Sequence, residues 1–136
     1  ASKYNAEIVS LDGIYDVDAD IYAPCALGAT LNTENIARLK CQVISGAANN
    51  QLADEYVHGP MLEQKGILYA PDFLINAGGL INVYSELHGY DRKVAIQHTE
   101  AIYDTTLEVF KKATAEKIST IEAAKKIAEE RILSKK

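Results

Sequence analysis

The chain alternates short apolar runs with stretches of helical pattern, and this alternation constrains its fold more than any other feature. The runs are rich in β-branched residues and continuous, as is typical of strands buried on both faces of a parallel sheet. Three of them stop at Pro24, Gly46 or Pro71, residue types that end strands. The four predicted strands are Glu7–Ser10, Asp20–Ala23, Gln42–Ser45 and Gly66–Ala70.

Helical patterns fill the intervals at Asn32–Leu39 and Asn49–Lys65, and only helical patterns follow Pro71. Strands separated by helices form βαβ units. We therefore predict an α/β fold, a partial doubly wound (Rossmann-like) parallel sheet of about four strands followed by C-terminal helices. In this single domain the βαβ units occupy residues 1–75 and the C-terminal helices residues 76–136. Those helices are predicted at 76–88, at 91–113 and from the capping box Ser119–Glu122 onward.

The composition describes one globular domain. The chain has 136 residues, of which 48% are apolar and 24% charged, enough for a real core. Its net charge of −5 argues against nucleic acid as a partner, because nucleic-acid binding needs a basic surface. No apolar run approaches the roughly 18 residues of a membrane span. Cys25 and Cys41 suit a reducing cytoplasm better than a disulfide scaffold.

Small residues follow three of the predicted strands. The segments are 23–29, 45–50 and 70–72, the last of which leads into 76–79. Ligands of doubly wound sheets bind outside the carboxyl ends of the strands. Small side chains let the backbone approach a flat ring such as nicotinamide, and Asn49 and Asn76 add amide groups beside it. The alternative is that these residues only pack tight strand-to-helix turns.

A helix that starts near Asn76 would place a polar amide at the head of an apolar stripe. Asn76, Leu80 and Val83 would then share one face with Leu87. Such a face can orient the polar end of a small ligand while the stripe holds its apolar tail. Asp72, in the turn after Pro71, is expected to cap backbone amides.

Three segments resemble the leucine dehydrogenases and their relatives acting on valine, phenylalanine and glutamate. Residues 22–32, 45–52 and 69–90 occur in the order and spacing of that family, and 128–132 resembles a late helix of it. The resemblance implies an NAD-dependent oxidative deamination of leucine or valine to a 2-oxo acid and ammonia. It also implies a cytoplasmic homo-oligomer and a small-molecule amino-acid substrate.

The same resemblance assigns roles to single residues. Cofactor-binding positions, which line the nicotinamide and its ribose, are Pro24, Cys25, Ala26, Asn49 and Asn76. Substrate-binding positions are Asn76, which matches the asparagine at the substrate's polar end, with Leu80 and Val83 in the side-chain pocket. Many leucine dehydrogenases carry valine at the position of Leu80, so the preference between leucine and valine stays open.

Other parts of the family's machinery have no counterpart in the sequence. It has no GxGxxG, and its only Gly-Gly pair does not directly follow a strand. The family's catalytic lysine and aspartate belong to a separate N-terminal domain, so we assign no catalytic residue. His58, His88 and His98 lack metal-ligand spacing, and no metal is expected. We therefore predict a fragment, without the N-terminal catalytic domain and the GxGxxG unit, that is inactive by itself.

Two other interpretations remain open. The first is a non-catalytic, truncated Rossmann-like module that self-associates or binds a partner through the apolar surface that missing strands would expose. The second is a different Rossmann oxidoreductase, which the length of the 69–90 match disfavours.

Overall fold

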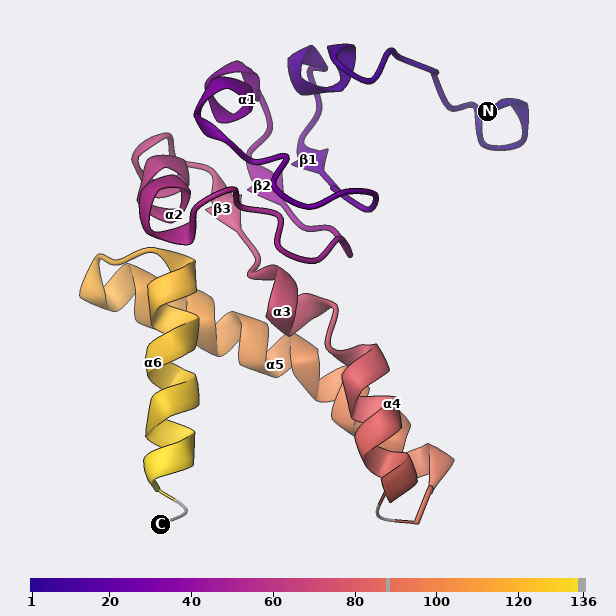
Figure 1. The fold of residues 1–136 in the computed structure, drawn as a ribbon, viewed down its shortest axis with the longest axis vertical. Coiled ribbons are helices and arrows are strands. Elements are labelled where there is room, and N and C mark those ends of the chain that lie inside the picture. Colours follow the sequence, from indigo (N-terminus) through magenta and orange to yellow (C-terminus); the bar gives the residue numbers. More distant parts are fainter. Residues whose placement is uncertain (88, 135–136) are drawn as a thin grey trace.

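A three-stranded parallel sheet carries helices on one side and continues into a helical C-terminal half (Figure 1). In this computed structural model, residues 1–87 and 89–134 are described. The strands are β1 (Ile21–Tyr22), β2 (Val43–Ile44) and β3 (Leu68–Tyr69), in the order β1-β2-β3. The helices are α1 (Thr33–Arg38), α2 (Glu55–Gln64), α3 (Asp72–Ile75), α4 (Gly78–Leu87), α5 (Arg92–Glu116) and α6 (Thr120–Leu133), preceded by the 3-10 turns η1 (Ser2–Tyr4) and η2 (Gly13–Asp16).

The α/β class and the parallel sheet are confirmed, but the predicted strand at Glu7–Ser10 is wrong. That segment is exposed coil on an arm that leads away from the sheet (Figure 1). An apolar run becomes a strand only where a neighbouring strand offers backbone partners, and none lies beside this one among the described residues. The other three predicted strands hold at their centres and are shorter at both ends.

The two faces of the sheet differ in cover. Strand register aligns Tyr22, Ile44 and Tyr69 across the three strands. Ile44 and Tyr69 are buried in a core cluster with α1 and α2. That cluster comprises Leu31, Ile36, Leu39, Cys41, Ile44, Leu62, Ile67, Tyr69 and Ile121.

The preceding register row, Ile21, Val43 and Leu68, faces the opposite way because side chains alternate along a strand. Ile21 is 59% exposed, and Leu68 is also exposed. The second face of the sheet is therefore only partly covered within this chain.

Side-chain caps explain where the helices begin. Asn32 Oδ1 accepts the Asn35 N–H at the start of α1, and Asp54 accepts N–H groups at the start of α2. Asp91 does the same for α5. The predicted cap of the last helix is confirmed, since Ser119 Oγ accepts the Glu122 N–H at 3.3 Å.

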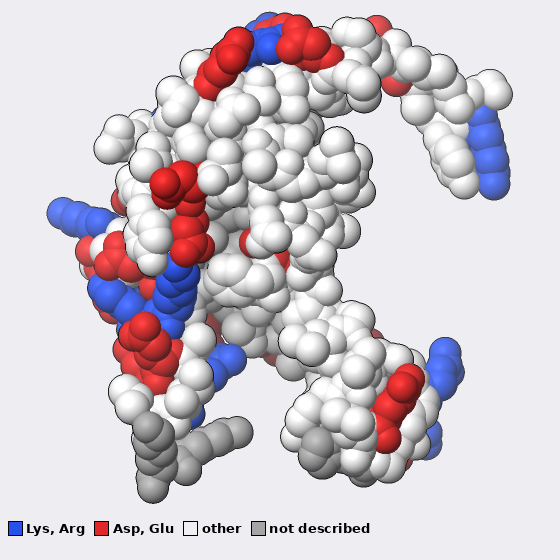
Figure 2. Space-filling view, in the orientation of Figure 1, with Lys and Arg blue, Asp and Glu red and all other residues white. Residues whose placement is uncertain are grey.

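The helical half is held together by a second apolar cluster between α5 and α6. It contains Val109, Ala113, Ala123, Ala124 and Ile127. Helix α6 begins at this end of α5, whereas α4 lies along the opposite end, and both helices point away from the sheet (Figure 1). Charged side chains gather over α6, around α1 and at the far end of α4, whereas the face between them is largely uncharged (Figure 2).

Candidate functional site

Hydrogen bonds join the loops that follow the carboxyl ends of β1 and β2. Pro24 O accepts the Ala48 N–H at 3.0 Å, and Cys25 Sγ accepts the Ala47 N–H at 3.4 Å. A Cβ on Gly46 would lie 2.2 Å from Pro24 O and 2.4 Å from Pro24 N. Only glycine therefore allows the two loops to touch at this point. Pro24 is buried, while Cys25 and its neighbour Ala26 remain exposed.

Further backbone contacts join the same two loops. Ala29 N donates to Asn50 O at 2.7 Å, and Leu31 pairs with Leu52 in a parallel bridge. Ala29 and Asn50 both have a positive φ, of 57° and 51°. Left-handed backbone at a non-glycine residue is held only where its surroundings impose it, and such strain clusters at functional sites.

Asn49 and Asn76 meet at the next strand end along the sheet. Asn76 Nδ2 donates to Asn49 Oδ1 at 2.6 Å, although 27 residues separate the two. A longer bond of 3.4 Å joins Asn76 Nδ2 to Ala47 O. Asn49 Nδ2 and Asn76 Oδ1 have no protein partner among residues 1–87 and 89–134. The pair thus presents one donor group and one acceptor to the outside.

Gln51 supports this pair, and sequence reasoning missed it. Its side chain is fully buried, and its Nε2 donates to Gly46 O at 2.6 Å and Ala48 O at 2.9 Å. The only signal in the sequence was a glutamine between small residues and Leu52. A polar residue in a loop normally indicates exposure, so that signal pointed the wrong way.

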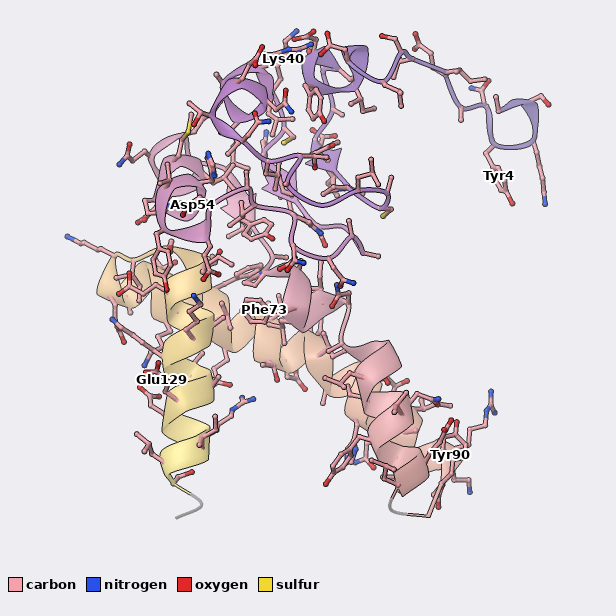
Figure 3. All side chains as sticks on the ribbon, viewed as in Figure 1. Tyr4, Lys40, Asp54, Phe73, Tyr90 and Glu129 are labelled. Carbon is pink, nitrogen blue, oxygen red and sulfur yellow. The ribbon has the colours of Figure 1, made fainter. Side chains whose placement is uncertain are left out.

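Asp72 joins the second loop to the start of α3. Its Oδ2 accepts the Gln51 N–H at 3.0 Å, and its Oδ1 accepts the Phe73 N–H at 2.9 Å. The predicted amide-capping role is thereby confirmed. Burial raises the pKa of nearby Tyr69, and the Asp72 charge raises it further, so this phenol stays neutral. Phe73 lies where the sheet meets α5 (Figure 3).

The shared helix face predicted for Asn76, Leu80 and Val83 is wrong in part. Asn76 caps the end of α3, and α4 begins two residues later at Gly78. Leu80 is 74% and Val83 55% exposed, whereas the half-buried residues of α4 include Ile81. The predicted last residue of this helix, His88, lies outside the described residues.

The candidate residues border separate hollows. Pro24, Cys25 and Ala26 line one of about 540 Å³ beside β1. Asn49 lines another of about 620 Å³ that extends to α2 and Phe73. Neither is lined by Leu80 or Val83, so the apolar wall predicted on α4 stands apart from both.

None of the lysines with a shifted pKa among the described residues lies on the rim formed by the loops after β1, β2 and β3. Lys112, Lys125 and Lys126 have a raised pKa, because glutamates accept hydrogen bonds from each of them. A lysine base would need a lowered pKa instead. Within residues 1–87 and 89–134, no three histidine, cysteine or acidic side chains gather as metal ligands. No helix in that part of the chain is both long and apolar enough to cross a bilayer.

Comparison with known proteins identifies the family. The family model for glutamate/leucine/phenylalanine/valine dehydrogenases matches residues 1–135, so the chain belongs to this family. The leucine dehydrogenase of Thermoactinomyces intermedius is 57% identical over 96% of the chain and 35% of its own length. The L-tryptophan dehydrogenase of Nostoc punctiforme is 50% identical over 98% of the chain and 38% of its own length.

Solved structures agree on the fold. The crystal structure of the Nostoc punctiforme L-tryptophan dehydrogenase superimposes with a TM-score of 0.93, over 96% of the chain and 39% of that structure. A hetero-hexameric glutamate dehydrogenase from Thermus thermophilus, 20% identical, gives a TM-score of 0.73 over 93% of the chain and 32% of that structure. The chain thus spans little more than a third of the length of the relatives it matches.

Proposed function

We propose that this chain forms the nicotinamide side and one wall of the substrate pocket in an NAD-dependent dehydrogenase of branched-chain L-amino acids. The reaction is the oxidative deamination of leucine or valine to a 2-oxo acid and ammonia. The Asn49–Asn76 contact carries the proposal, because it brings together two amides from separate strand ends with one donor and one acceptor left over.

The donor set suits the proposed cofactor. A carboxamide or a ribose hydroxyl both donates and accepts hydrogen bonds, which matches Asn49 Nδ2 and Asn76 Oδ1. Pro24, Cys25 and Ala26 offer small side chains beside the same edge, where a flat ring can approach the backbone. When bound, NAD would accept a hydride from the α-carbon of the amino acid.

The chain's own residues then have distinct tasks. Asn76 orients the polar end of the substrate next to the cofactor. Leu80 and Val83, exposed on α4, hold the apolar side chain of the substrate once other parts of a larger enzyme cover them. No residue of this chain is proposed to move a proton, so the chain alone is expected to be inactive.

Substrate size and assembly are part of the proposal. Relatives at similar identity are named for leucine and for tryptophan, so the family's pocket wall accommodates side chains of different size. The related glutamate dehydrogenase is hetero-hexameric, which supports an oligomer for the enzyme proposed here. A cytoplasmic location is also part of the proposal, because free cysteines such as Cys25 and Cys41 are compatible with a reducing compartment.

A chimera tests the proposal. The matched segment of the Thermoactinomyces intermedius leucine dehydrogenase is replaced by this chain, and NAD-dependent oxidation of leucine and valine is measured. We expect an active enzyme whose kcat/KM falls about 100-fold in Asn76→Ala, because orientation at the reacting centre is lost. Gln97→Leu, on the exposed side of α5, is the matched control. A folded but inactive chimera, or full activity in Asn76→Ala, would contradict the proposal.

The second candidate function is a non-catalytic module that self-associates or binds a partner. The partly covered second face of the sheet favours this function, because exposed apolar sheet faces attract other chains. That face carries Ile21, Val43 and Leu68. Light scattering of the purified chain distinguishes the two. A stable oligomer of the chain alone, together with an inactive chimera, would favour the module.

A further inference from the structure

Gln51 is an unusual residue to bury in a loop. Its side chain is wholly inaccessible, yet its Oε1 has no hydrogen-bond partner among the described residues. An unsatisfied buried acceptor lowers the stability of the folded state. An apolar residue of similar size would fill the space without that penalty. It would, however, leave Gly46 O and Ala48 O without the two hydrogen bonds that Nε2 donates to them.

Those two bonds set the curvature of the loop that presents Asn49. Gly46 O and Ala48 O lie on either side of Ala47 and both accept from the single Nε2. The loop is consequently wrapped around the Gln51 side chain, with Asn49 on its outer surface. The amide cannot be reversed, since Oε1 would then face two carbonyl oxygens.

Asp72 fixes the other side of the contact. Its carboxylate accepts one N–H from Gln51 and one from Phe73, so a buried charge joins the second loop to the first turn of α3. Hydrogen bonds to a charged acceptor are among the stronger ones. Asn76 caps the end of that same short helix, one turn further on. The distance between Asn49 and Asn76 is thereby set from both ends.

We propose that Gln51 and Asp72 are positioning residues that hold Asn49 and Asn76 within hydrogen-bond distance of each other. Both are buried and both border the hollow that Asn49 lines, but the hydrogen bonds of their side chains are all made to backbone groups of the chain. The claim that these residues hold the two asparagines together rests only on the hydrogen bonds described above. The claim that this matters for catalysis rests on the proposed function, and each claim has its own test.

The first of these claims is tested by NMR of the side-chain NH2 groups in the full 136-residue chain. In Gln51→Leu we expect the Asn76 NH2 signals to shift toward solvent-exposed positions and to lose protection from exchange. Methyl signals of the buried core, such as Leu62, should stay in place. Gln97→Leu should change neither. Unchanged Asn76 signals in a folded Gln51→Leu chain would overturn the proposal.

Gln51→Glu provides a conditional version of the same test. At about pH 8 the introduced carboxylate has no proton to donate and faces two carbonyl oxygens, so the Asn76 NH2 signals should shift as in Gln51→Leu. At about pH 5 the acid is expected to be protonated, because burial and the neighbouring Asp72 charge raise its pKa. It then donates one bond, and the signals should return toward those of the unaltered chain at that pH. Failure to return would mean that Gln51 only fills space.

Asp72→Asn tests the other half, with Asp104→Asn on exposed α5 as its control. The two substitutions are then combined in the chimera described above. Together, Gln51→Leu and Asp72→Asn should lower kcat about 100-fold and change KM much less, because the substrate is still bound but is no longer aligned for the reaction. Signal shifts without a kinetic change would uphold the positioning role and contradict the proposed function. A kinetic loss without signal shifts would overturn the positioning role.

Discussion

The rim formed by the loops after β1, β2 and β3 differs sharply from the neighbouring helix α4. Every loop of the rim is joined to the next through named bonds, from Pro24 to Ala48, from Gln51 to Asp72 and from Asn76 to Asn49. Helix α4 fully buries none of its residues within this chain, and Leu80, Val83 and Leu87 face outward. The polar part of the candidate site is thus organised by the chain itself, whereas the apolar wall proposed on α4 has little cover within this chain.

The largest difference should appear at two glycines, one in each region. Gly46→Ala places a methyl group against Pro24 backbone atoms, and the free energy of unfolding should fall by about 4 kcal/mol or more. Gly79→Ala in α4 meets nothing within 4 Å and should raise stability by roughly 0.5–1 kcal/mol. Urea denaturation measures both. Similar effects at the two sites would remove the contrast between rim and helix.

Two leucines offer the next comparison. Leu62→Ala opens a cavity in the core beneath the sheet and should lower the free energy of unfolding by about 3 kcal/mol. Leu80→Ala on α4 should change it by less than about 0.5 kcal/mol, since that side chain is already exposed. A large loss at Leu80, measured by the same denaturation, would mean that α4 is covered in solution, for example by a second copy of the chain.

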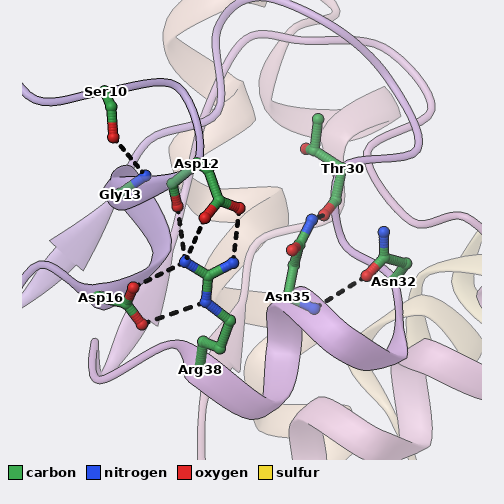
Figure 4. A network of polar contacts seen from close by, with 8 residues as sticks. All are labelled: Ser10, Asp12, Gly13, Asp16, Thr30, Asn32, Asn35 and Arg38. Atoms are coloured by element: carbon green, nitrogen blue, oxygen red, sulfur yellow. Dashed lines mark hydrogen bonds and ion pairs between the residues drawn. The ribbon is translucent and has the colours of Figure 1, made fainter.

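A smaller effect is expected where η2 meets α1. Arg38 donates to the carboxylates of Asp12 and Asp16 (Figure 4). Its guanidinium also lies 5.5 Å from the centre of the Tyr15 ring. These hydrogen bonds hold the pKa of both aspartates below their ordinary value. Their contribution is therefore complete above about pH 4 and disappears as the pH falls through the lowered pKa values.

Arg38→Ala should accordingly lower the Tm at about pH 7 and much less at about pH 2, where both aspartates are protonated. The Tyr15 contact leaves a small residual difference. The control is Arg131→Ala, which removes an exposed pair with Glu108 on the helical half and should have little effect at either pH. An equal loss of Tm at both pH values would assign the Arg38 effect to packing alone.

The smallest effect is expected for Leu80→Val, which removes one methylene from the proposed pocket wall. Stability should stay within about 0.5 kcal/mol. In the chimera, the ratio of kcat/KM for leucine over valine should rise by roughly fourfold, corresponding to about 0.8 kcal/mol per methylene. An unchanged ratio would remove Leu80 from the substrate pocket. Val57→Ala, at an exposed position of α2, serves as the control.

The local sequence pattern was sufficient to predict the fold class and the approximate position of most helices and strands. The runs around Ile21, Val43 and Leu68 became strands because each has a parallel neighbour. Glu7–Ser10 has the same local character and stayed coil, because pairing is a property of the surroundings. The helix predicted from Asn49 begins only at Glu55, since residues 49–53 form the rim and Asp54 supplies the cap.

The geometry of the candidate site could be predicted where it depends on strand ends, but not where it depends on burial. Asn49 and Asn76 follow neighbouring strands, and topology alone brings such residues together. Gln51 could not be found this way, because its burial results from the path of the loop around it. Leu80, Val83 and Leu87 are exposed together on α4, as their spacing predicts, but the separate short helix α3, which ends at Asn76, was not predicted from the sequence.

The hydrogen bonds that join the loops of the rim also have a thermodynamic consequence for ligand binding. Side chains that are ordered only on binding lose rotamer entropy of about 0.5–1.5 kcal/mol each. Asn49 and Asn76 already hold each other in the absence of a ligand, so a polar group that docks there should bind with a small entropic penalty and a favourable enthalpy. Burial of an apolar side chain against α4 should instead appear as a negative heat-capacity change that grows with the size of that side chain. Calorimetry over a series of amino acids would therefore separate the two halves of the site within a single ligand.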